Sequence, residues 1–493
     1  MKILFIVPAT GFYLSALSNP LGVLSIATFL KNNRHNIKIH DRNVEKINLD
    51  KLIKSYNPDI IGVSVLSSRS LKDALKVSKK VKEHKKMLVW GGQIPTMHPA
   101  LCLSGTFIDY IIMGEGEITW LEFVTQLGNY ESPNDINGIA YKDNGHIVIT
   151  KCRAFADLKD LPIIDWSLLN PTKYFKKYFH SDKMLYLYSS KGCPYNCSFC
   201  GNREYHLCTY RLRPADMTTE EIEQLINNYE LNGVYFSDEI WRVQKEDAYE
   251  FCRKVKEKNL KFVWGCDSRI GQYDKNDLQV MYDAKCRWIL FGIESGSKTM
   301  LNKIHKGISI DDVEENLSNC KKIGITPITT FIIGFPDETE GQVKETVNLA
   351  MRIQSKLVQV NYFFPMPGSD LYRELVDRGQ YKPPETLYQL SKVIAQNSLE
   401  QNLSKVPSKD LHVIRCFFQW VAFTGKDTIN KGRAFAFTWQ AISDMFSVIT
   451  KKGIWFFIVG IMMAAKEFLY IFWHVVAYPG VKKKYGLYLR NKK

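Results

Sequence analysis

The chain has 493 residues, a formal net charge of +15, 45% hydrophobic residues and 24% charged residues. This composition is ordinary for a globular protein, and the length predicts two or three domains with ample cores. No nucleic-acid-binding motif accompanies the positive charge, so we expect an anionic substrate or membrane surface rather than nucleic acid as partner. The first eight residues predict a strand rather than a signal peptide, and the 11 cysteines indicate a reducing, cytoplasmic location.

Residues 1–125 alternate short apolar runs with helical patterns. Strands are expected at 2–7, 37–39, 60–65, 87–92 and 110–113, with helices at 20–30 and 71–84. This alternation predicts a parallel, Rossmann-like (flavodoxin-like) sheet that binds its ligand at the carboxyl ends of the strands. Glycines and small hydroxyl residues follow several of these strands and would admit a bulky ligand close to the backbone. Turns that need glycine for their conformation are the alternative explanation.

Residues 126–183 are expected to link two domains. Two short apolar runs between 136 and 149 flank Asp143, Asn144 and Gly145, a strong turn signal, and predict a β-hairpin. The segment that follows has no periodic pattern. We therefore expect a linker that carries one hairpin.

In residues 184–395 the alternation of strands and helices resumes. Strands are expected at 184–188, 234–236, 262–265, 288–292, 329–333 and 358–364. Six strand–helix units predict a partial (β/α)6 barrel, whose functional groups would lie at the carboxyl ends of its strands. Polar residues follow these strands one after another, which favours a site over ordinary solvated loops.

Three cysteines follow the first of these strands. Cys193, Cys197 and Cys200 have the spacing C-x3-C-x2-C. Three thiolates on one loop can hold three irons of a [4Fe–4S] cluster, which normally has four ligands, and leave one iron open to a small molecule. A zinc site with Cys208 or His206 as fourth ligand is the alternative.

Residues 396–493 are expected to be helical. Helices are expected at 411–423 and 434–449, followed by an apolar, aromatic segment at 454–478. Polar residues recur every fourth position near its end and lysines flank it, which predicts an amphipathic helix at the inner face of the membrane. A helical cap that packs on the barrel is an equal alternative.

The cysteine loop, with Phe199 directly before its last cysteine, and the barrel behind it resemble the radical S-adenosylmethionine (SAM) superfamily. The Pro20–Gly22 turn, the Gly91–Gly92 pair and the Gly114–Glu117 stretch resemble the cobalamin-binding domain of cobalamin-dependent radical SAM enzymes. One departure is that residues 41–44 lack the cobalt-binding histidine of better-known cobalamin domains. The resemblance implies a [4Fe–4S] cluster, SAM and methylcobalamin as cofactors, and flavodoxin or ferredoxin as one-electron reductant.

The resemblance also implies the site residues, apart from a further catalytic residue, which it does not identify. The cluster ligands are Cys193, Cys197 and Cys200. The SAM-binding residues are Phe199, Ser237, Asp238, Glu239, Ser268, Arg269, Glu294, Ser295, Ile333, Gly334, Phe335 and Pro336. The cobalamin-binding residues are Pro20, Leu21, Gly22, Asp41, Asn43, Ser64, Leu66, Ser67, Gly91, Gly92, Gln93, Pro95, Gly114, Glu115 and Glu117. Arg211 and Arg213 are expected to neutralise a carboxylate or a cobalamin phosphate.

The expected function is methylation of an unactivated centre of a lipid, an isoprenoid or a secondary metabolite. A ring-forming enzyme similar to the anaerobic magnesium-protoporphyrin cyclase is one alternative. A methylthiotransferase would need a second cysteine-ligated cluster, whereas only Cys102 precedes residue 150. A non-catalytic cobalamin or iron–sulfur sensor is the alternative from a different class, and it would not need the SAM pocket that the barrel implies.

Overall fold

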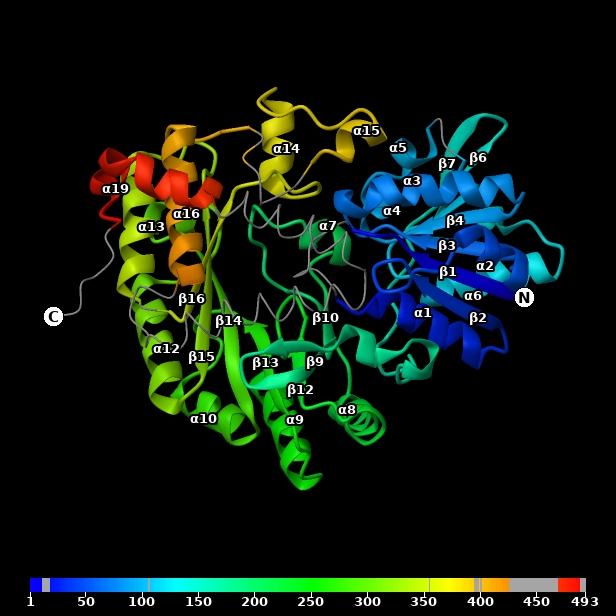
Figure 1. Ribbon diagram of the computed structural model, residues 1–493, viewed down its shortest axis with the longest axis horizontal. Coiled ribbons are helices and arrows are strands. Elements are labelled where there is room, and N and C mark those ends of the chain that lie inside the picture. Colours follow the sequence, from blue (N-terminus) through cyan, green and yellow to red (C-terminus); the bar gives the residue numbers. More distant parts are fainter. Residues whose placement is uncertain are drawn as a thin grey trace.

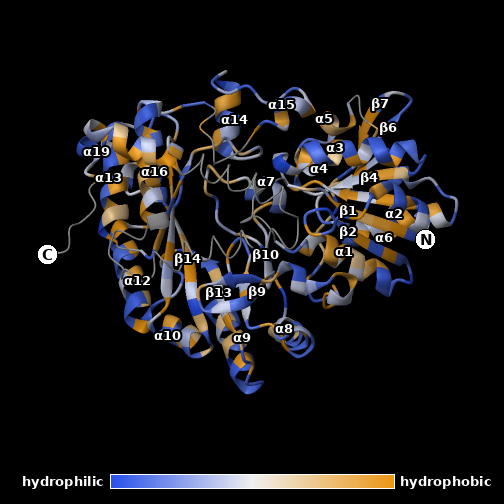
Figure 2. Ribbon diagram, in the orientation of Figure 1, coloured by the Kyte–Doolittle hydropathy of each residue, from blue (hydrophilic) through white to orange (hydrophobic). Residues whose placement is uncertain are grey.

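The computed structural model describes residues 1–10, 18–104, 107–353, 355–393, 399, 401–424 and 469–487. Figure 1 shows two lobes, each built around a seven-stranded sheet, with the N-terminal lobe at the right and the second lobe at the left. The predicted fold, a Rossmann-like domain followed by a partial barrel, is confirmed. In Figure 2 hydrophobic residues concentrate on the strands and on the helix sides that face them.

The first sheet has the strand order β2-β1-β3-β4-β5-β6-β7, and β1 to β5 are parallel. These five strands are β1 (Lys2–Val7), β2 (Asn36–Asp41), β3 (Ile60–Ser64), β4 (Met87–Gly91) and β5 (Tyr110–Ile112). Along β1, Ile3 and Phe5 belong to one hydrophobic core and Leu4 and Ile6 to another. Both faces of the strand are therefore buried, which explains its continuous apolar run.

Helices cover both faces of the first sheet. α1 (Leu21–Asn32) and α6 (Glu117–Gly128) contact each other on one face, and α2 (Leu49–Tyr56) and α3 (Ser68–Glu83) contact each other on the opposite face. The short helices α4 (Gln93–Met97) and α5 (Pro99–Leu103) follow β4. This arrangement leaves the carboxyl ends of β3, β4 and β5 directed towards the second lobe (Figure 1).

The predicted hairpin consists of β6 (Ile139–Asp143) and β7 (His146–Ile149). Asn144 and Gly145 both have positive φ, 47° and 86°, as a two-residue hairpin turn requires. The hairpin does not belong to a free linker, because β6 pairs antiparallel with β5 and extends the first sheet. A short 3-10 helix, Pro133–Asp135, precedes the hairpin. After the hairpin, the connector runs through two more 3-10 helices, Trp166–Leu168 and Pro171–Tyr174.

The second sheet has the order β16-β15-β14-β13-β12-β9-β8. Its six parallel strands are β9 (Ser181–Leu187), β12 (Gly233–Phe236), β13 (Val263–Ser268), β14 (Cys286–Glu294), β15 (Thr326–Ile333) and β16 (Leu357–Tyr362). The strand β8 (Lys176–Tyr178) adds an antiparallel edge. All six predicted barrel strands are therefore confirmed, in the predicted order along the chain.

Alternate residues of the barrel strands face opposite sides of the sheet. Phe236, Trp264 and Phe331 belong to the large core shared with the outer helices, whereas Tyr235 and Trp288 belong to a separate inner cluster. The helices of this lobe are α8 (Ala215–Tyr229), α9 (Lys245–Glu257), α10 (Lys275–Asp283), α11 (Lys298–Lys303), α12 (Ile310–Ile323), α13 (Glu340–Arg352) and α14 (Asp370–Asp377). The short helix α15 (Leu387–Leu390) follows α14 and packs into the core of the first lobe.

The described C-terminal helices pack on the last part of the barrel. α16 (Ser408–Thr424) contacts β16 and confirms the helix expected at 411–423, and α19 (Pro479–Tyr485) contacts α13 and α16. The helix expected at 434–449 and most of the segment 454–478 lie outside the described residues, although 469–477 are helical. In the part of the chain that the structure describes, no helix is long and apolar enough to cross a membrane.

Candidate active site and cofactor cavity

The cysteine loop lies between the short strand β10 (Ser190–Gly192) and the helix α7 (Asn202–His206). β10 pairs antiparallel with β11 (Tyr210–Leu212). Gly192 has a φ of +84°, and a Cβ atom there would lie 2.2 Å from the Thr209 carbonyl oxygen, so only glycine fits. The Ser198 amide donates to the Ile304 carbonyl at 3.0 Å, and the Ser198 carbonyl accepts from the Leu371 amide at 2.9 Å. These bonds fix the loop over the barrel mouth.

Cys193, Cys197 and Cys200 are free thiols that are only partly exposed. Burial raises the pKa of Cys193 to about 11, and the charges of the Cys200 and Cys197 thiolates add to the rise. No group of three or more His, Cys, Asp or Glu side chains that could hold a metal ion occurs among the residues described. Each cysteine of a [4Fe–4S] cluster binds a different iron, so its ligands need not converge on one point. The three soft donors fit such a cluster.

The alternative fourth zinc ligand, His206, has a different partner. Its Nε2 atom lies 3.1 Å from Glu239 Oε1, and Glu239 Oε2 accepts the Gly192 amide at 3.0 Å. Glu239 therefore joins the end of β12 to both flanks of the cysteine loop.

Two cationic side chains face the cysteine loop from the barrel. Arg269, which follows β13, places Nη1 3.8 Å from Cys197 Sγ. Lys306 lies near the Phe199 ring, with Nζ 6.0 Å from its centroid, and forms an ion pair with Glu294 Oε1 at 2.9 Å. Arg269 and Glu294, both predicted for SAM, thus lie beside the cysteines. Lys306 carried no recognisable signal in the sequence.

The predicted adenine-binding stretch 333–336 also lies against the cysteine loop. Phe335 makes an edge-to-face contact with Phe199, their ring centroids 5.9 Å apart. Glu338, fully buried, accepts the Gly334 and Phe335 amides at 2.6 and 3.2 Å. Burial raises the pKa of Glu338 to about 7. Glu338 shapes this turn, although no local sequence pattern marks it.

Three predicted SAM residues are committed to internal bonds. Asp238 is 1% exposed and accepts the Ser189 amide and the Ser189 and Ser190 hydroxyls, each at 2.8 Å. Burial raises its pKa to about 6. Ser295 bonds to Thr346 of α13 at 3.1 Å, and Ser268 bonds to Gln272 at 3.0 Å. Neighbouring residues of a strand face opposite sides of the sheet. These three side chains therefore bond to the surrounding protein and stabilise the strand ends.

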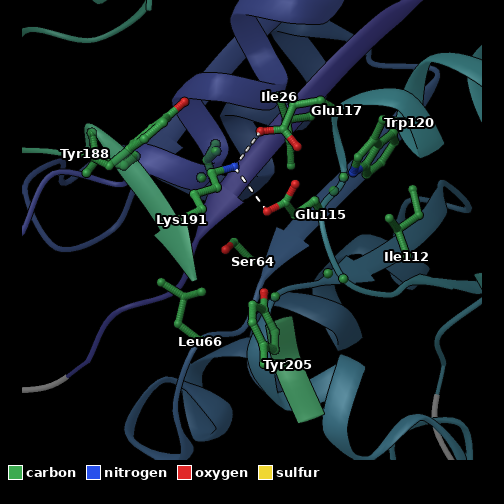
Figure 3. Close-up of a pocket in the computed structure, with 18 of the residues that line it drawn as sticks. Ile26, Ser64, Leu66, Ile112, Glu115, Glu117, Trp120, Tyr188, Lys191 and Tyr205 are labelled. Carbon is green, nitrogen blue, oxygen red and sulfur yellow. Dashed lines mark hydrogen bonds and ion pairs between the residues drawn. The ribbon is translucent and has the colours of Figure 1, made fainter. Parts of the chain in front are cut away.

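A cavity of about 400 Å³ opens between the first sheet and the cysteine loop (Figure 3). The second lobe contributes Tyr188, Ser190, Lys191, Tyr205, His206, Ser237 and Glu239. The predicted cobalamin residues that line the cavity are Leu21, Gly22, Ser64, Leu66, Gly91, Gly92, Gly114, Glu115 and Glu117. Strand ends of one domain thus face the residues that flank the predicted cluster loop of the other. The room left by glycines at these strand ends fits a bulky cofactor.

Six residues predicted for cobalamin are not among those lining the cavity: Pro20, Asp41, Asn43, Ser67, Gln93 and Pro95. Asp41 ends β2, the edge strand, and accepts the Asn43 amide and the Tyr174 hydroxyl at 2.8 and 2.9 Å. Asn43 accepts the Thr10 amide at 2.9 Å. The cavity lies over β3 to β5 instead, so the residues that follow β2 hold the sheet edge.

A charge network joins the two domains at the cavity wall. Lys191 Nζ lies 3.3 Å from Glu117 Oε1 and 3.7 Å from Glu115 Oε1, as Figure 3 shows. Burial lowers the pKa of Lys191, but the two carboxylates outweigh it and raise the pKa above its usual value. Glu115 also accepts two bonds from Arg211, at 2.5 and 2.9 Å. No local sequence pattern indicates these partners of Lys191, which lies two residues before Cys193 in the chain.

The two arginines expected to neutralise a carboxylate or a cobalamin phosphate both pair with carboxylates of the protein itself. Arg211 neutralises Glu115 of the first domain, and Arg213 forms a buried ion pair with Glu221 of α8. Both carboxylates belong to this chain. Each guanidinium is therefore held by a carboxylate within the protein.

The two-domain architecture, the three-cysteine loop over the barrel mouth and the cavity between the domains define the class of cobalamin-dependent radical SAM enzymes. Residues 187–350 match the radical SAM superfamily, and residues 14–124 match the B12 binding domain. The chain belongs to this family and is an enzyme. The two matches bear out SAM and cobalamin as predicted cofactors.

Two curated relatives and one solved structure illustrate the family. The chain is 29% identical over 386 residues to an uncharacterized methyltransferase of Pyrococcus horikoshii, covering 76% of this chain and 82% of the relative. It is 26% identical over 394 residues to the anaerobic magnesium-protoporphyrin IX monomethyl ester cyclase of Rubrivivax gelatinosus, covering 77% and 70%. The radical SAM methyltransferase TsrM of Kitasatospora setae has the same fold, with a TM-score of 0.65, 15% identity and coverage of 76% and 75%.

Proposed function

We propose that the chain is a methyltransferase that methylates an unactivated centre of a small molecule. The carrying observation is the cavity, because the strand ends of the first domain and the flanks of the cysteine loop line the same space. A methyl donor held there would lie next to a SAM molecule bound at the barrel mouth. The similarity to the Pyrococcus horikoshii methyltransferase supports this activity.

We assign the residues of the chain the following roles. When bound, the cluster and cobalamin supply the electron that cleaves SAM and the methyl group that is transferred. Cys193, Cys197 and Cys200 hold the cluster. The turn at 333–336 packs on the adenine beside Phe199. Glu294 binds a polar group of SAM, and Lys306 orients the Glu294 carboxylate. Ser237 and Glu239 line the cavity and would contact the cobalamin held there.

Ring formation is the second candidate reaction. The similarity to the Rubrivivax gelatinosus cyclase supports it, since that relative matches a similar share of the chain. The two reactions differ in the fate of the SAM methyl group. Methyl transfer places that group in the product, whereas ring formation does not.

We propose a lipid or isoprenoid as substrate class, on an enzyme that lies peripherally at the inner face of the membrane. Leu469, Trp473 and Val476, at the described end of the segment 454–478, expose 62%, 63% and 53% of their surface. Lys482 and Lys483 follow in α19, where the adjacent Lys484 pairs with Glu340 and Asp410. Apolar side chains beside a basic cluster suit the surface of an anionic bilayer. Co-sedimentation with anionic but not neutral vesicles tests this.

Anaerobic reconstitution with iron, sulfide, cobalamin and methyl-labelled SAM tests the proposed function. With dithionite or reduced flavodoxin as one-electron donor, we expect about four irons per chain, bound cobalamin and release of 5′-deoxyadenosine. Offered isoprenoid or lipid acceptors, the enzyme should yield a labelled product. Zinc without iron, or an unlabelled cyclised product, would contradict the proposal.

Two cysteine variants make the test specific. Cys197→Ala should abolish both iron retention and SAM cleavage, because it removes a cluster ligand. Cys208→Ala is the matched control, since Cys208 is also a free, partly buried thiol close to the loop. It should retain iron and cleavage, and a loss equal to that of Cys197→Ala would favour the zinc alternative.

A further inference from the structure

The Arg269 side chain is clamped beside the cysteine loop. Its guanidinium carbon lies 4.1 Å from the centroid of the Tyr195 ring, and Nη1 lies 3.8 Å from Cys197 Sγ. On the other side, a Cβ atom at Gly307 would lie 3.1 Å from Arg269 Nη2. Tyr195, Cys197 and Gly307 therefore hold the guanidinium in one place.

Among the described residues, the positive charge of Arg269 is not neutralised by an ion pair, unlike the charge of Lys306. Lys306 pairs with Glu294 at 2.9 Å, whereas no carboxylate among the described residues forms an ion pair with Arg269. An arginine remains protonated at any pH at which the enzyme works. A full positive charge thus faces the sulfur of Cys197.

We propose that Arg269 tunes the reduction potential of the cluster by donating a hydrogen bond to the Cys197 sulfur and holding a positive charge beside it. This inference rests on the proposed cluster at Cys193, Cys197 and Cys200. Net charge and hydrogen bonds to the sulfurs both set the potentials of iron–sulfur clusters. It assigns Arg269 to the cluster rather than to the SAM carboxylate.

The direction of the effect follows from electrostatics. Reduction adds one electron from a low-potential donor to the cluster, and no bond is made or broken. The reduced cluster carries one more negative charge than the oxidised one, so a neighbouring positive charge stabilises it more. Arg269 therefore raises the reduction potential and makes the cluster easier to reduce.

The test is an anaerobic dithionite titration of the reconstituted full-length holoenzyme, without SAM, followed by electron paramagnetic resonance. At a potential where the wild type is half reduced, Arg269→Gln should lower the ratio of reduced to oxidised cluster about tenfold, equivalent to about 59 mV for one electron. Arg269→Lys keeps the charge but loses the planar fork, and should lower the ratio less.

Arg287→Gln is the matched control. Arg287 stacks on Tyr282 at 4.2 Å, much as Arg269 stacks on Tyr195, but lies at the start of β14, the opposite end of the strand from Glu294. The cluster of the Arg287→Gln variant should have the same reduction potential as the cluster of the wild type. An equal fall in this variant would overturn the inference.

The remaining outcomes are distinct. An iron-loaded Arg269→Gln with an unchanged potential overturns the inference, as does an unchanged potential combined with weakened SAM binding, which would assign the arginine to SAM. If Arg269→Gln takes up no iron, Arg269→Lys decides: a potential below wild type supports the inference and an unchanged one overturns it. A wild type that holds no iron contradicts the proposed function itself.

Discussion

The two lobes present different groups at the carboxyl ends of their parallel strands. In the first lobe these ends are mainly backbone and small side chains, such as Ser64, Gly91 and Gly92. In the barrel they carry charged side chains such as Arg269 and Glu294, close to the cysteine loop. The same strand–helix architecture thus makes room for a large ligand in one lobe and supplies charge in the other. Substitutions in the two lobes should therefore affect stability and cofactor binding in different ways.

The largest effect is expected from Arg213→Met in the barrel lobe. Its ion pair with Glu221 is buried, with 3% and 1% of the two side chains exposed, and Glu221 also accepts the Trp166 indole N–H at 2.9 Å. Leaving Glu221 charged and unpaired should cost about 3–5 kcal/mol of stability. Denaturant midpoints would measure this. The double variant Arg213→Met/Glu221→Gln should recover part of the loss, and no recovery would contradict the ion-pair explanation.

Gly92→Ala tests the first lobe, where backbone conformation makes the site. Gly92 has φ +104° and ψ −173°, a region essentially reserved for glycine, and a Cβ atom would lie 2.9 Å from the Val65 carbonyl oxygen. We expect a loss of roughly 1–3 kcal/mol and weaker cobalamin binding. Gly114→Ala, where a Cβ atom would meet nothing within 4 Å beyond its chain neighbours, should cost less by thermal unfolding. Equal losses would show that space around Gly92 is unimportant.

Glu338→Gln tests the turn under the predicted adenine site through pH. The folded-state pKa of Glu338 is about 7, above the ordinary 4.5, because the carboxyl is buried. The unfolded chain releases this proton first, so stability should fall as pH rises from about 4.5 to about 7. Between pH 5 and 8, the free energy of unfolding of Glu338→Gln, measured by denaturant titration, should fall less than that of wild type, by on the order of 2 kcal/mol. The exposed Glu345→Gln is the control and should follow wild type.

Lys191→Met tests where the two lobes meet. Glu115 keeps Arg211 as partner, but among the described residues Glu117 keeps only the Ser25 hydroxyl, at 2.6 Å. The uncompensated carboxylate should disturb the cavity wall and weaken cobalamin binding roughly tenfold, about 1.4 kcal/mol. Equilibrium titration with cobalamin measures this. Adding Glu117→Gln should restore part of the affinity. An unchanged cobalamin affinity in Lys191→Met would show that the charge network does not contribute to cobalamin binding.

Local pattern was sufficient for most of the fold. The continuous apolar run of β1 and the Asp143–Gly145 turn signal carry their structure in neighbouring residues, so strands and hairpin were predictable. The partner of the hairpin was not, since β6 pairs with β5 across a segment that contains α6. The segments 434–449 and most of 454–478 remain predictions.

The candidate site divides in the same way. Nine of the predicted cobalamin residues line the cavity, because glycine and small residues after buried strands are a local signal. Asp41 and Asn43 follow a buried strand too, but β2 lies at the sheet edge, and only strand order reveals that. Ser268 and Ser295 end the right strands but face the helices, which depends on the phase of each strand.

The sequence by itself determined the two alternating strand–helix regions, the cysteine loop and the class of cofactors, because each depends on residues close together in the chain. Only the tertiary structure decided the charges around them. Lys191 meets Glu117 across 74 residues, and Arg269 meets Cys197 across 72. Such contacts follow from how separate strands are brought to one edge, and no local pattern encodes a partner at that distance.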